Sequence, residues 1–167
     1  MAKLNWSEAY RQQAFSDYEV FEKLNSSGVS YCHILRYMQM CTEKLAKSFI
    51  SAQSNKERQP NSHKVLVQFI RATHNYEQLY LSMNFTKRNA YSNYLNKVIL
   101  PVAKALEDYY PSGEYDKPNT EYPWEINNNI ALPNDYYFPA LDETNSRVAA
   151  FWDYIRKCFV FFSSQTY

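Results

Sequence analysis

The stretch YCHILRYMQMCTEKLAKSFI, residues 31–50, decides the fold of this chain. It contains no Gly or Pro, and its apolar residues recur in steps of three or four, at Ile34, Met38, Cys41, Leu45 and Phe49. This spacing is the period of an α-helix and not of a strand. The opposite side carries charged residues, at Arg36, Glu43, Lys44 and Lys47. Because such a helix must bury its apolar stripe against other elements, we expect it at the centre of a helical bundle.

Apolar residues at helical spacing predict four further helices, over residues 6–25, 63–83, 86–109 and 143–162. We expect Asn5 to cap the first helix and Glu8 to complete a capping box. The helix from His63 should be bent. Pro101 lies inside the 86–109 helix, and because it has no N–H to bond to the carbonyl of Lys97, we expect a kink or break there. The prediction is an all-α, up-and-down bundle of four or five helices, with residues 1–167 forming one domain.

Residues 111–142 follow no helical pattern and carry five prolines and six aromatic residues. Loops of this length are uncommon inside a compact domain and are usually functional or disordered. The density of aromatic rings argues against disorder. We therefore expect a strap that packs its rings over the bundle before the last helix. Its Tyr122-Pro123-Trp124 cluster offers two roles, capping the core or stacking a nucleobase.

Charge is unevenly distributed along the chain, although the net charge is only +1. Residues 53–110 hold eight Lys or Arg and four Asp or Glu, whereas residues 111–142 hold one Lys and six Asp or Glu. Two explanations stay open: the acidic strap lies over the basic part of its own bundle, or the basic residues form a surface that binds nucleotide or RNA. The residues of that surface would be Lys56, Arg58, Lys64, Arg71, Lys87 and Arg88.

Composition argues against several other classes. Two glycines cannot form a Gly-rich phosphate loop, and three cysteines with three histidines show no zinc spacing. The odd cysteine count suits free thiols in a reducing compartment. The N-terminal residues lack the apolar core of a signal peptide, and no run is long enough to span a membrane. We expect a cytoplasmic protein with no metal, no cofactor and no membrane contact.

The first helical hairpin resembles the HEPN family, the "higher eukaryotes and prokaryotes nucleotide-binding" domain. The second helix of that family often reads like QQAAEKALKALL, and the segment QMCTEKLAK at residues 39–47 keeps the Gln, the Glu-Lys pair and the later Lys. Trp6 and His63 also fall where family members often have these residue types. The match covers about the first 70 residues. The resemblance implies a helical bundle, commonly a homodimer, encoded in prokaryotes and often in toxin–antitoxin or defence settings.

Some HEPN relatives are metal-independent ribonucleases, and others are non-catalytic partners of small nucleotidyltransferases. The nucleases carry an Arg followed four to six residues later by a His, facing one cleft across a dimer. The Arg stabilises phosphate charge and the His transfers a proton as the RNA 2′-hydroxyl attacks. Arg58 and His63 have this spacing, but in a predicted loop, and Arg88 on the 86–109 helix is followed by no His at the required distance.

Three functional hypotheses follow. The first is a non-catalytic HEPN-like module that acts through dimerisation, by a face that includes the last helix, and through binding of a protein, a nucleotide or RNA. The second is a HEPN-like ribonuclease with Arg58 and His63 as its catalytic residues. The third is a helical domain with a small-molecule pocket under the strap.

Overall fold

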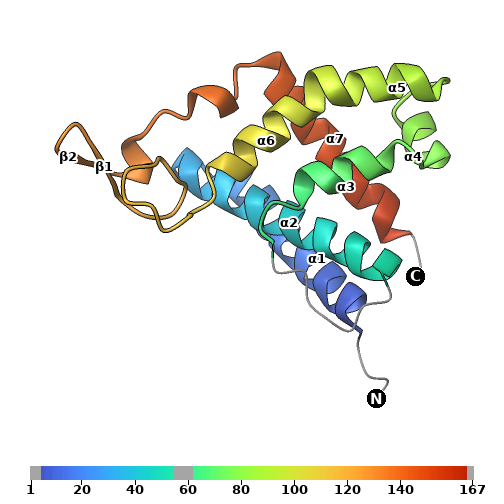
Figure 1. Ribbon diagram of the computed structural model, residues 1–167, viewed down its shortest axis with the longest axis horizontal. Helices are drawn as coiled ribbons and strands as arrows, with labels where there is room; N and C mark the ends of the chain where they lie inside the picture. Colours follow the sequence, from blue (N-terminus) through green and yellow to red (C-terminus); the bar gives the residue numbers. More distant parts are fainter. Residues whose placement is uncertain (1–4, 55–61, 165–167) are drawn as a thin grey trace.

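Two long antiparallel helices form one side of the bundle. The computed structural model describes residues 5–54 and 62–164, and begins with α1 (Trp6–Asn25) and α2 (Tyr31–Ser54) side by side along their length (Figure 1). The Asn5 side chain caps α1 as predicted, accepting from the Glu8 N–H at 2.8 Å. The capping box is not completed, because the Glu8 carboxylate instead accepts from Arg11. The predicted all-α bundle is confirmed.

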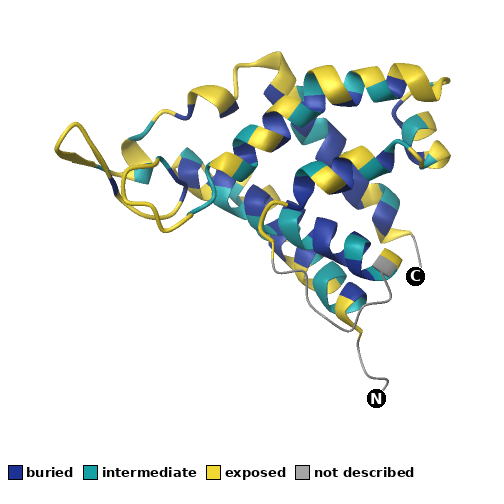
Figure 2. Cartoon of the chain, viewed as in Figure 1, coloured by how far each residue is buried: buried dark blue, intermediate teal, exposed yellow. Residues whose placement is uncertain are grey.

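The predicted apolar stripe of α2 is buried, with Met38 and Cys41 fully inaccessible to solvent (Figure 2). It packs between α1, α3 and α6. Several polar side chains of the same helix are also buried: Gln39, Thr42, Lys47 and Ser48. Since buried polar groups need partners, the polar face of α2 must be matched by groups from other elements.

The predicted bent helix over 63–83 is two helices, α3 (Leu66–Thr73) and α4 (Glu77–Ser82). The chain breaks because the Tyr76 N–H bonds to the Thr73 carbonyl at 3.0 Å and Tyr76 itself is extended. The start of α3 is also later than predicted, since residues 62–65 are irregular. A carboxylate from α6 pairs with a free N–H group in the first turn of α3: Glu107 accepts from the Val67 N–H at 3.1 Å.

The predicted helix over 86–109 continues through Pro101 with a change of hydrogen-bond pattern. It consists of α5 (Arg88–Tyr94), a π-helical turn (Leu95–Ile99) and α6 (Leu100–Asp108), which follow one another along one path (Figure 1). The Leu100 N–H bonds to the carbonyl of Leu95, five residues earlier. This wider turn precedes the proline, which cannot bond to the carbonyl of Lys97.

The last helix, α7 (Ser146–Ser163), closes the core between the α1–α2 pair and the α5–α6 rod. The Asn145 side chain caps it, accepting from the Arg147 N–H at 2.9 Å. Its ring contacts reach α1, where Tyr18 stacks on Phe159 at 4.1 Å. The apolar residues on its inner face are buried, namely Val148, Phe151, Ile155, Phe159 and Phe162, and Trp152 beside them is half-buried. On the outer face, Val160 is exposed.

The strap contains a hairpin that the periodicity analysis missed. Strands β1 (Trp124–Ile126) and β2 (Asn129–Ala131) pair antiparallel, and Asn127 and Asn128 form the turn with φ of 50° and 62°. Asparagine tolerates positive φ, which a two-residue hairpin turn of this kind needs. Two 3₁₀ turns follow, at Pro133–Asp135 and Pro139–Leu141. The hairpin projects beyond the helices (Figure 1).

Candidate functional site

His63 lies against the polar face of α2, in a cluster of side chains that contact one another. Its Nδ1 is 3.1 Å from Oε1 of Glu43, which also accepts from Lys47 at 2.7 Å. The carboxylate and the ammonium are largely buried, whereas the imidazole side chain is 51% exposed. A carboxylate beside one ring nitrogen favours the proton there and leaves the other nitrogen to act as an acceptor. The arrangement can therefore orient His63 for proton transfer or for hydrogen bonding to a ligand.

Tyr110 fixes the plane of the same imidazole. The two rings are stacked with centroids 4.3 Å apart, and the guanidinium of Arg36 lies 5.6 Å from the Tyr110 centroid. Arg36 is engaged with Glu121 of the strap at 2.8 Å. The guanidinium that lies over Tyr110 is thus held by a strap carboxylate.

The pocket beside His63 is small and mostly apolar. It holds about 10 Å³, which is space for a single water, and no described Lys or Arg lines it. Its lining residues are Gln39, Thr42, Glu43, His63, Leu66, Leu106, Glu107 and Tyr110. A nucleotide does not fit into this pocket, so any ligand contact with His63 must come from the solvent side.

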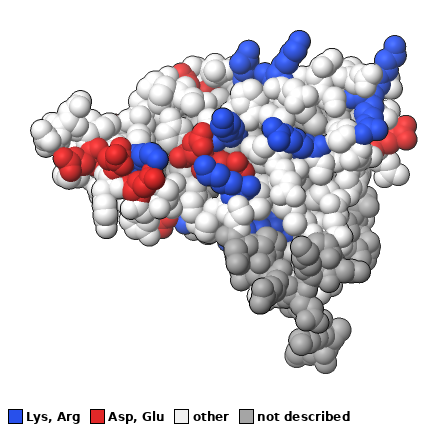
Figure 3. All heavy atoms as spheres, in the orientation of Figure 1, with Lys and Arg blue, Asp and Glu red and all other residues white. Residues whose placement is uncertain are grey.

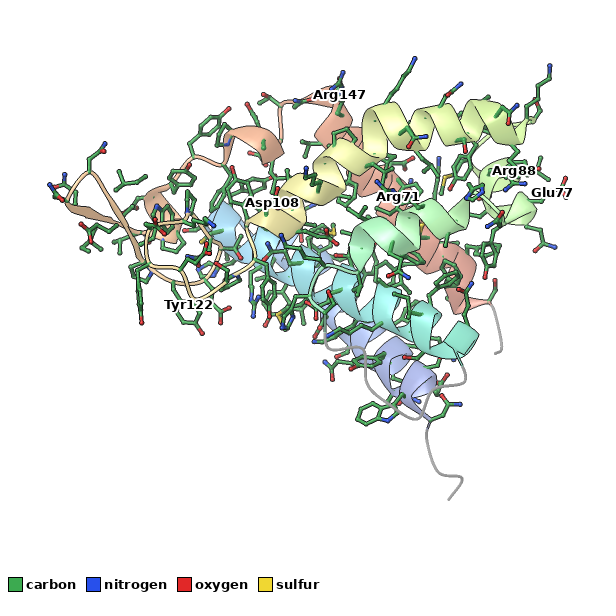
Figure 4. The ribbon with its side chains drawn as sticks, in the orientation of Figure 1. Arg71, Glu77, Arg88, Asp108, Tyr122 and Arg147 are labelled. Carbon is green, nitrogen blue, oxygen red and sulfur yellow. The ribbon has the colours of Figure 1, made fainter. Side chains whose placement is uncertain are left out.

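A larger groove of about 470 Å³ adjoins this cluster, between α3 and α6. Its lining residues are Lys64, Val67, Gln68, Arg71, Lys104, Glu107 and Asp108. Figure 4 shows Arg71 on α3 and Asp108 at the end of α6. Sequence reasoning missed Lys104, because only the packing of α3 against α6 brings it beside Arg71.

The two acidic groups of the groove are already engaged. Asp108 pairs with Lys64 at 3.6 Å, and Glu107 accepts the Val67 N–H. Burial raises the pKa of Glu107, and its backbone hydrogen bonds oppose that shift only in part. Within the described ranges 5–54 and 62–164, Arg71 and Lys104 have no carboxylate within ion-pair distance. The groove therefore offers two uncompensated cations.

Four of the six predicted surface residues lie in the described part of the chain, and these four are not gathered in one groove. Lys64 and Arg71 share the groove, but Arg88 lies toward the α4–α5 end, near Glu77 in Figure 4, and donates to Asn75 at 2.6 Å. Lys87 precedes Arg88 at the start of α5. Lys56 and Arg58 lie outside the described residues, so the predicted catalytic pairing of Arg58 with His63 stays a prediction.

The start of the strap lies near the basic segment, since the pKa of Glu114 is lowered mainly by Lys117 and also by Lys64, so the explanation that the strap lies over the basic part of its own bundle stays a prediction. The ion pairs of the strap run from Glu121 to Arg36 and from Glu114 to Lys117. Trp124 is buried and packs edge-on against Tyr136 at 4.9 Å, so it caps the core and cannot stack a base. Tyr122 is exposed.

Thiol and metal chemistry receive no support from the described part of the chain. All three cysteines are buried and free, and burial raises the pKa of each thiol, to about 12 for Cys158. No group of three His, Cys, Asp or Glu side chains within residues 5–54 and 62–164 is placed to hold a metal ion. None of the described helices has the length and apolar character needed to cross a bilayer.

No family model matches the chain, and no curated protein or solved structure matches it either. The HEPN resemblance therefore rests on the sequence of about the first 70 residues alone.

Proposed function

We propose that this chain is a non-catalytic, HEPN-like helical module that binds the phosphates of RNA in the groove between α3 and α6. The observation that carries the proposal is the pair Arg71 and Lys104, which face one groove from two helices without a described carboxylate partner. Lys64 extends the positive charge toward His63. Cations of this kind bind phosphate by releasing condensed counterions, which makes affinity depend on salt.

The surroundings of His63 favour binding over cleavage. The pocket at the imidazole has no described cation to stabilise a phosphorane-like charge, and the nearby Arg36 is held by Glu121. His63 is then a hydrogen-bonding and stacking residue at the edge of the RNA path, kept in place by Glu43. The family resemblance supports a homodimer in the cytoplasm of a prokaryote, in a toxin–antitoxin or defence setting, with a nucleotidyltransferase as a candidate partner.

Fluorescence anisotropy with a labelled single-stranded RNA tests the proposal. The double variant Arg71→Gln/Lys104→Gln should weaken binding and lower the slope of log affinity against log salt by about 1.4, since each single-strand phosphate contact contributes about 0.7. Lys97→Gln is the matched control, because Lys97 is an exposed lysine on the π-helical turn and does not line the groove. Wild-type affinity and slope in the double variant would reject the groove as the RNA site.

A second candidate function is metal-independent RNA cleavage by His63 with Arg58. The observation in its favour is the Glu43 carboxylate at Nδ1 of His63, which is how general-base histidines are commonly oriented. Cleavage of a labelled RNA in the presence of a chelator should then be lost in His63→Ala and reduced in Glu43→Gln. This function is excluded if the wild type binds RNA and leaves it intact. It is equally excluded if the His63→Ala variant cleaves RNA as well as the wild type does.

A further inference from the structure

The projecting part of the strap concentrates exposed apolar side chains. We define the hairpin lobe as residues 114–137. Six of the ten large apolar side chains that are exposed in the described residues belong to it: Tyr115, Tyr122, Ile126, Ile130, Leu132 and Tyr137. Exposed apolar residues are normal when scattered, whereas a cluster of them marks an interaction surface. Figure 2 shows the tip of the hairpin as an exposed segment beyond the helices, whereas Asn119, Thr120 and Trp124 of the lobe are buried.

The register of the hairpin determines which side chains face outward. Trp124 lies opposite Ala131 and is buried, so its face of the ribbon is the inner one. Glu125 lies opposite Ile130, and because neighbouring residues of a strand alternate between faces, these two belong to the outer face. Ile130 is 70% exposed. The outer face therefore presents an aliphatic side chain directly beside a carboxylate.

The lobe also carries uncompensated negative charge. Glu114 and Glu121 are paired with Lys117 and Arg36, but Asp116 and Glu125 have no cation within ion-pair distance in the part of the chain that the structure describes. Figure 3 shows acidic side chains gathered on this projecting part, with few basic side chains among them. A partner of the lobe must offer both positive charge and an apolar wall.

The α3–α6 groove has this complementary character. Arg71 and Lys104 are uncompensated there, and Val67 with the aliphatic stems of the basic residues supplies the apolar wall. The lobe approaches the groove of its own chain only at its start, where the pKa of Glu114 is lowered mainly by Lys117 and also by Lys64. Its base is tied to α2 by the Thr120 hydroxyl, which donates to Gln39 at 2.7 Å, and its tip points away from the helices (Figure 1).

We propose that the hairpin lobe of one copy docks into the α3–α6 groove of a second copy, with Glu125 against Arg71 or Lys104 and Ile130 against Val67. Each copy carries both surfaces, so two reciprocal contacts close a dimer. The proposal places the dimer contact on the lobe and the α3–α6 groove, and not on the face that includes the last helix, which we expected from the sequence. It also makes self-association and RNA binding compete for the same groove, and this competition rests on the proposed function.

Sedimentation velocity on the full chain at a series of concentrations and salt levels tests the contact. The wild type should form a dimer that dissociates more readily as salt rises. Glu125→Lys and Lys104→Glu should each raise the dissociation constant by about tenfold or more, because each places like charges in the contact. The double variant Glu125→Lys/Lys104→Glu should recover dimerisation, since the charge pair is restored with its signs exchanged.

The apolar half of the contact has its own pair of variants. Ile130→Ser should weaken the dimer, whereas Leu81→Ser should not, because Leu81 is an exposed leucine on α4 outside the lobe. A chain that is monomeric at all concentrations overturns the proposal. So does a dimer that is indifferent to Glu125→Lys, Lys104→Glu and Ile130→Ser, because its interface must then lie elsewhere.

Competition separates this proposal from the proposed function. RNA binding measured at protein concentrations below the dimer dissociation constant reports on the groove alone, and Ile130→Ser should leave it unchanged. At concentrations above that constant, Ile130→Ser should bind RNA more tightly than the wild type. If the groove variants leave RNA affinity unchanged but the double variant Glu125→Lys/Lys104→Glu recovers dimerisation, RNA binding is rejected and lobe docking stands. If the groove variants weaken RNA binding but the double variant does not recover dimerisation, lobe docking is rejected and RNA binding stands.

Discussion

Replacing Gln39 by Met should destabilise the fold through two buried groups to which Gln39 is hydrogen-bonded in the described structure. The amide of Gln39 donates to the Leu106 carbonyl at 2.6 Å and accepts from the Thr120 hydroxyl at 2.7 Å. The Leu106 carbonyl lies in the last turn of α6, where the Tyr110 N–H bonds to Glu107 instead. Gln39 is therefore the cap of α6 and the anchor of the strap at once.

The magnitude follows from the two unpaired groups. Met has nearly the shape of Gln, so packing changes little, but the Leu106 carbonyl and the Thr120 hydroxyl lose their partner in a buried site. Each buried group left without a partner costs about 1–3 kcal/mol, so we expect a loss of roughly 3 kcal/mol in the free energy of unfolding. For a domain of this size the same loss lowers Tm by about 6–12 °C.

Urea unfolding followed by far-ultraviolet circular dichroism measures this loss, and a double-mutant cycle assigns it. Thr120→Val should be destabilising alone but nearly neutral, or restoring, in the Gln39→Met background, because removing both partners leaves no orphaned hydroxyl. A Gln39→Met variant within about 0.5 kcal/mol of the wild type would refute the reasoning, since surface substitutions commonly have effects of that size. Strictly additive costs in the cycle would refute the Gln39–Thr120 coupling.

Three further outcomes follow from the described contacts. Thr73→Val should cost about 1–3 kcal/mol in urea unfolding, because the hydroxyls of Tyr91 and Tyr154 lose the Thr73 oxygen at 3.3 and 3.0 Å inside the core. Burial raises the pKa of Glu107 in the folded state, so the folded chain binds the proton more tightly than the unfolded chain does. The free energy of unfolding should therefore rise as pH falls from 7 toward the unfolded pKa of this group. Glu107→Gln should remove that component of the pH dependence of unfolding. The thiols of Cys32, Cys41 and Cys158 should react with a thiol-specific reagent only at the rate of unfolding, and rapid modification of any one in native buffer would contradict its buried placement.

The helices that the sequence predicted well are those whose signals are local. The 6–25 prediction coincides with α1, because the Asn5 cap and the apolar stripe lie within one segment. The sequence predicted a bend in the 63–83 helix but not a full break, because no Gly or Pro marks Thr73–Tyr76, where the Tyr76 N–H bonds to the Thr73 carbonyl and Tyr76 is extended. The hairpin was missed because Asn127-Asn128, its one local turn signal, sits among prolines and aromatic rings without strand-length alternation.

The candidate site depended on distant packing even more strongly. His63 was singled out from spacing and resemblance, but its partner Glu43 lies twenty residues away on α2. Lys104 carries no signal in the sequence that distinguishes it from Lys97, and only the α3–α6 contact selects it. Lys87 and Arg88 looked equivalent to Arg71 in sequence, yet they lie toward another end of the bundle. The residue types can be read from the sequence, whereas which of these side chains lie together in one site is known only from the fold.

The Asn127-Asn128 turn gives this protein a place where chain can be added. The turn is exposed, and the buried indole of Trp124 anchors the hairpin at its opposite end. Exposed tips of this kind are where inserted peptides are best tolerated, because no buried backbone bond has to break. A short epitope or a fluorophore-accepting sequence inserted between the two asparagines would leave the helices intact, and would mark the projecting end of the molecule for single-molecule or imaging experiments.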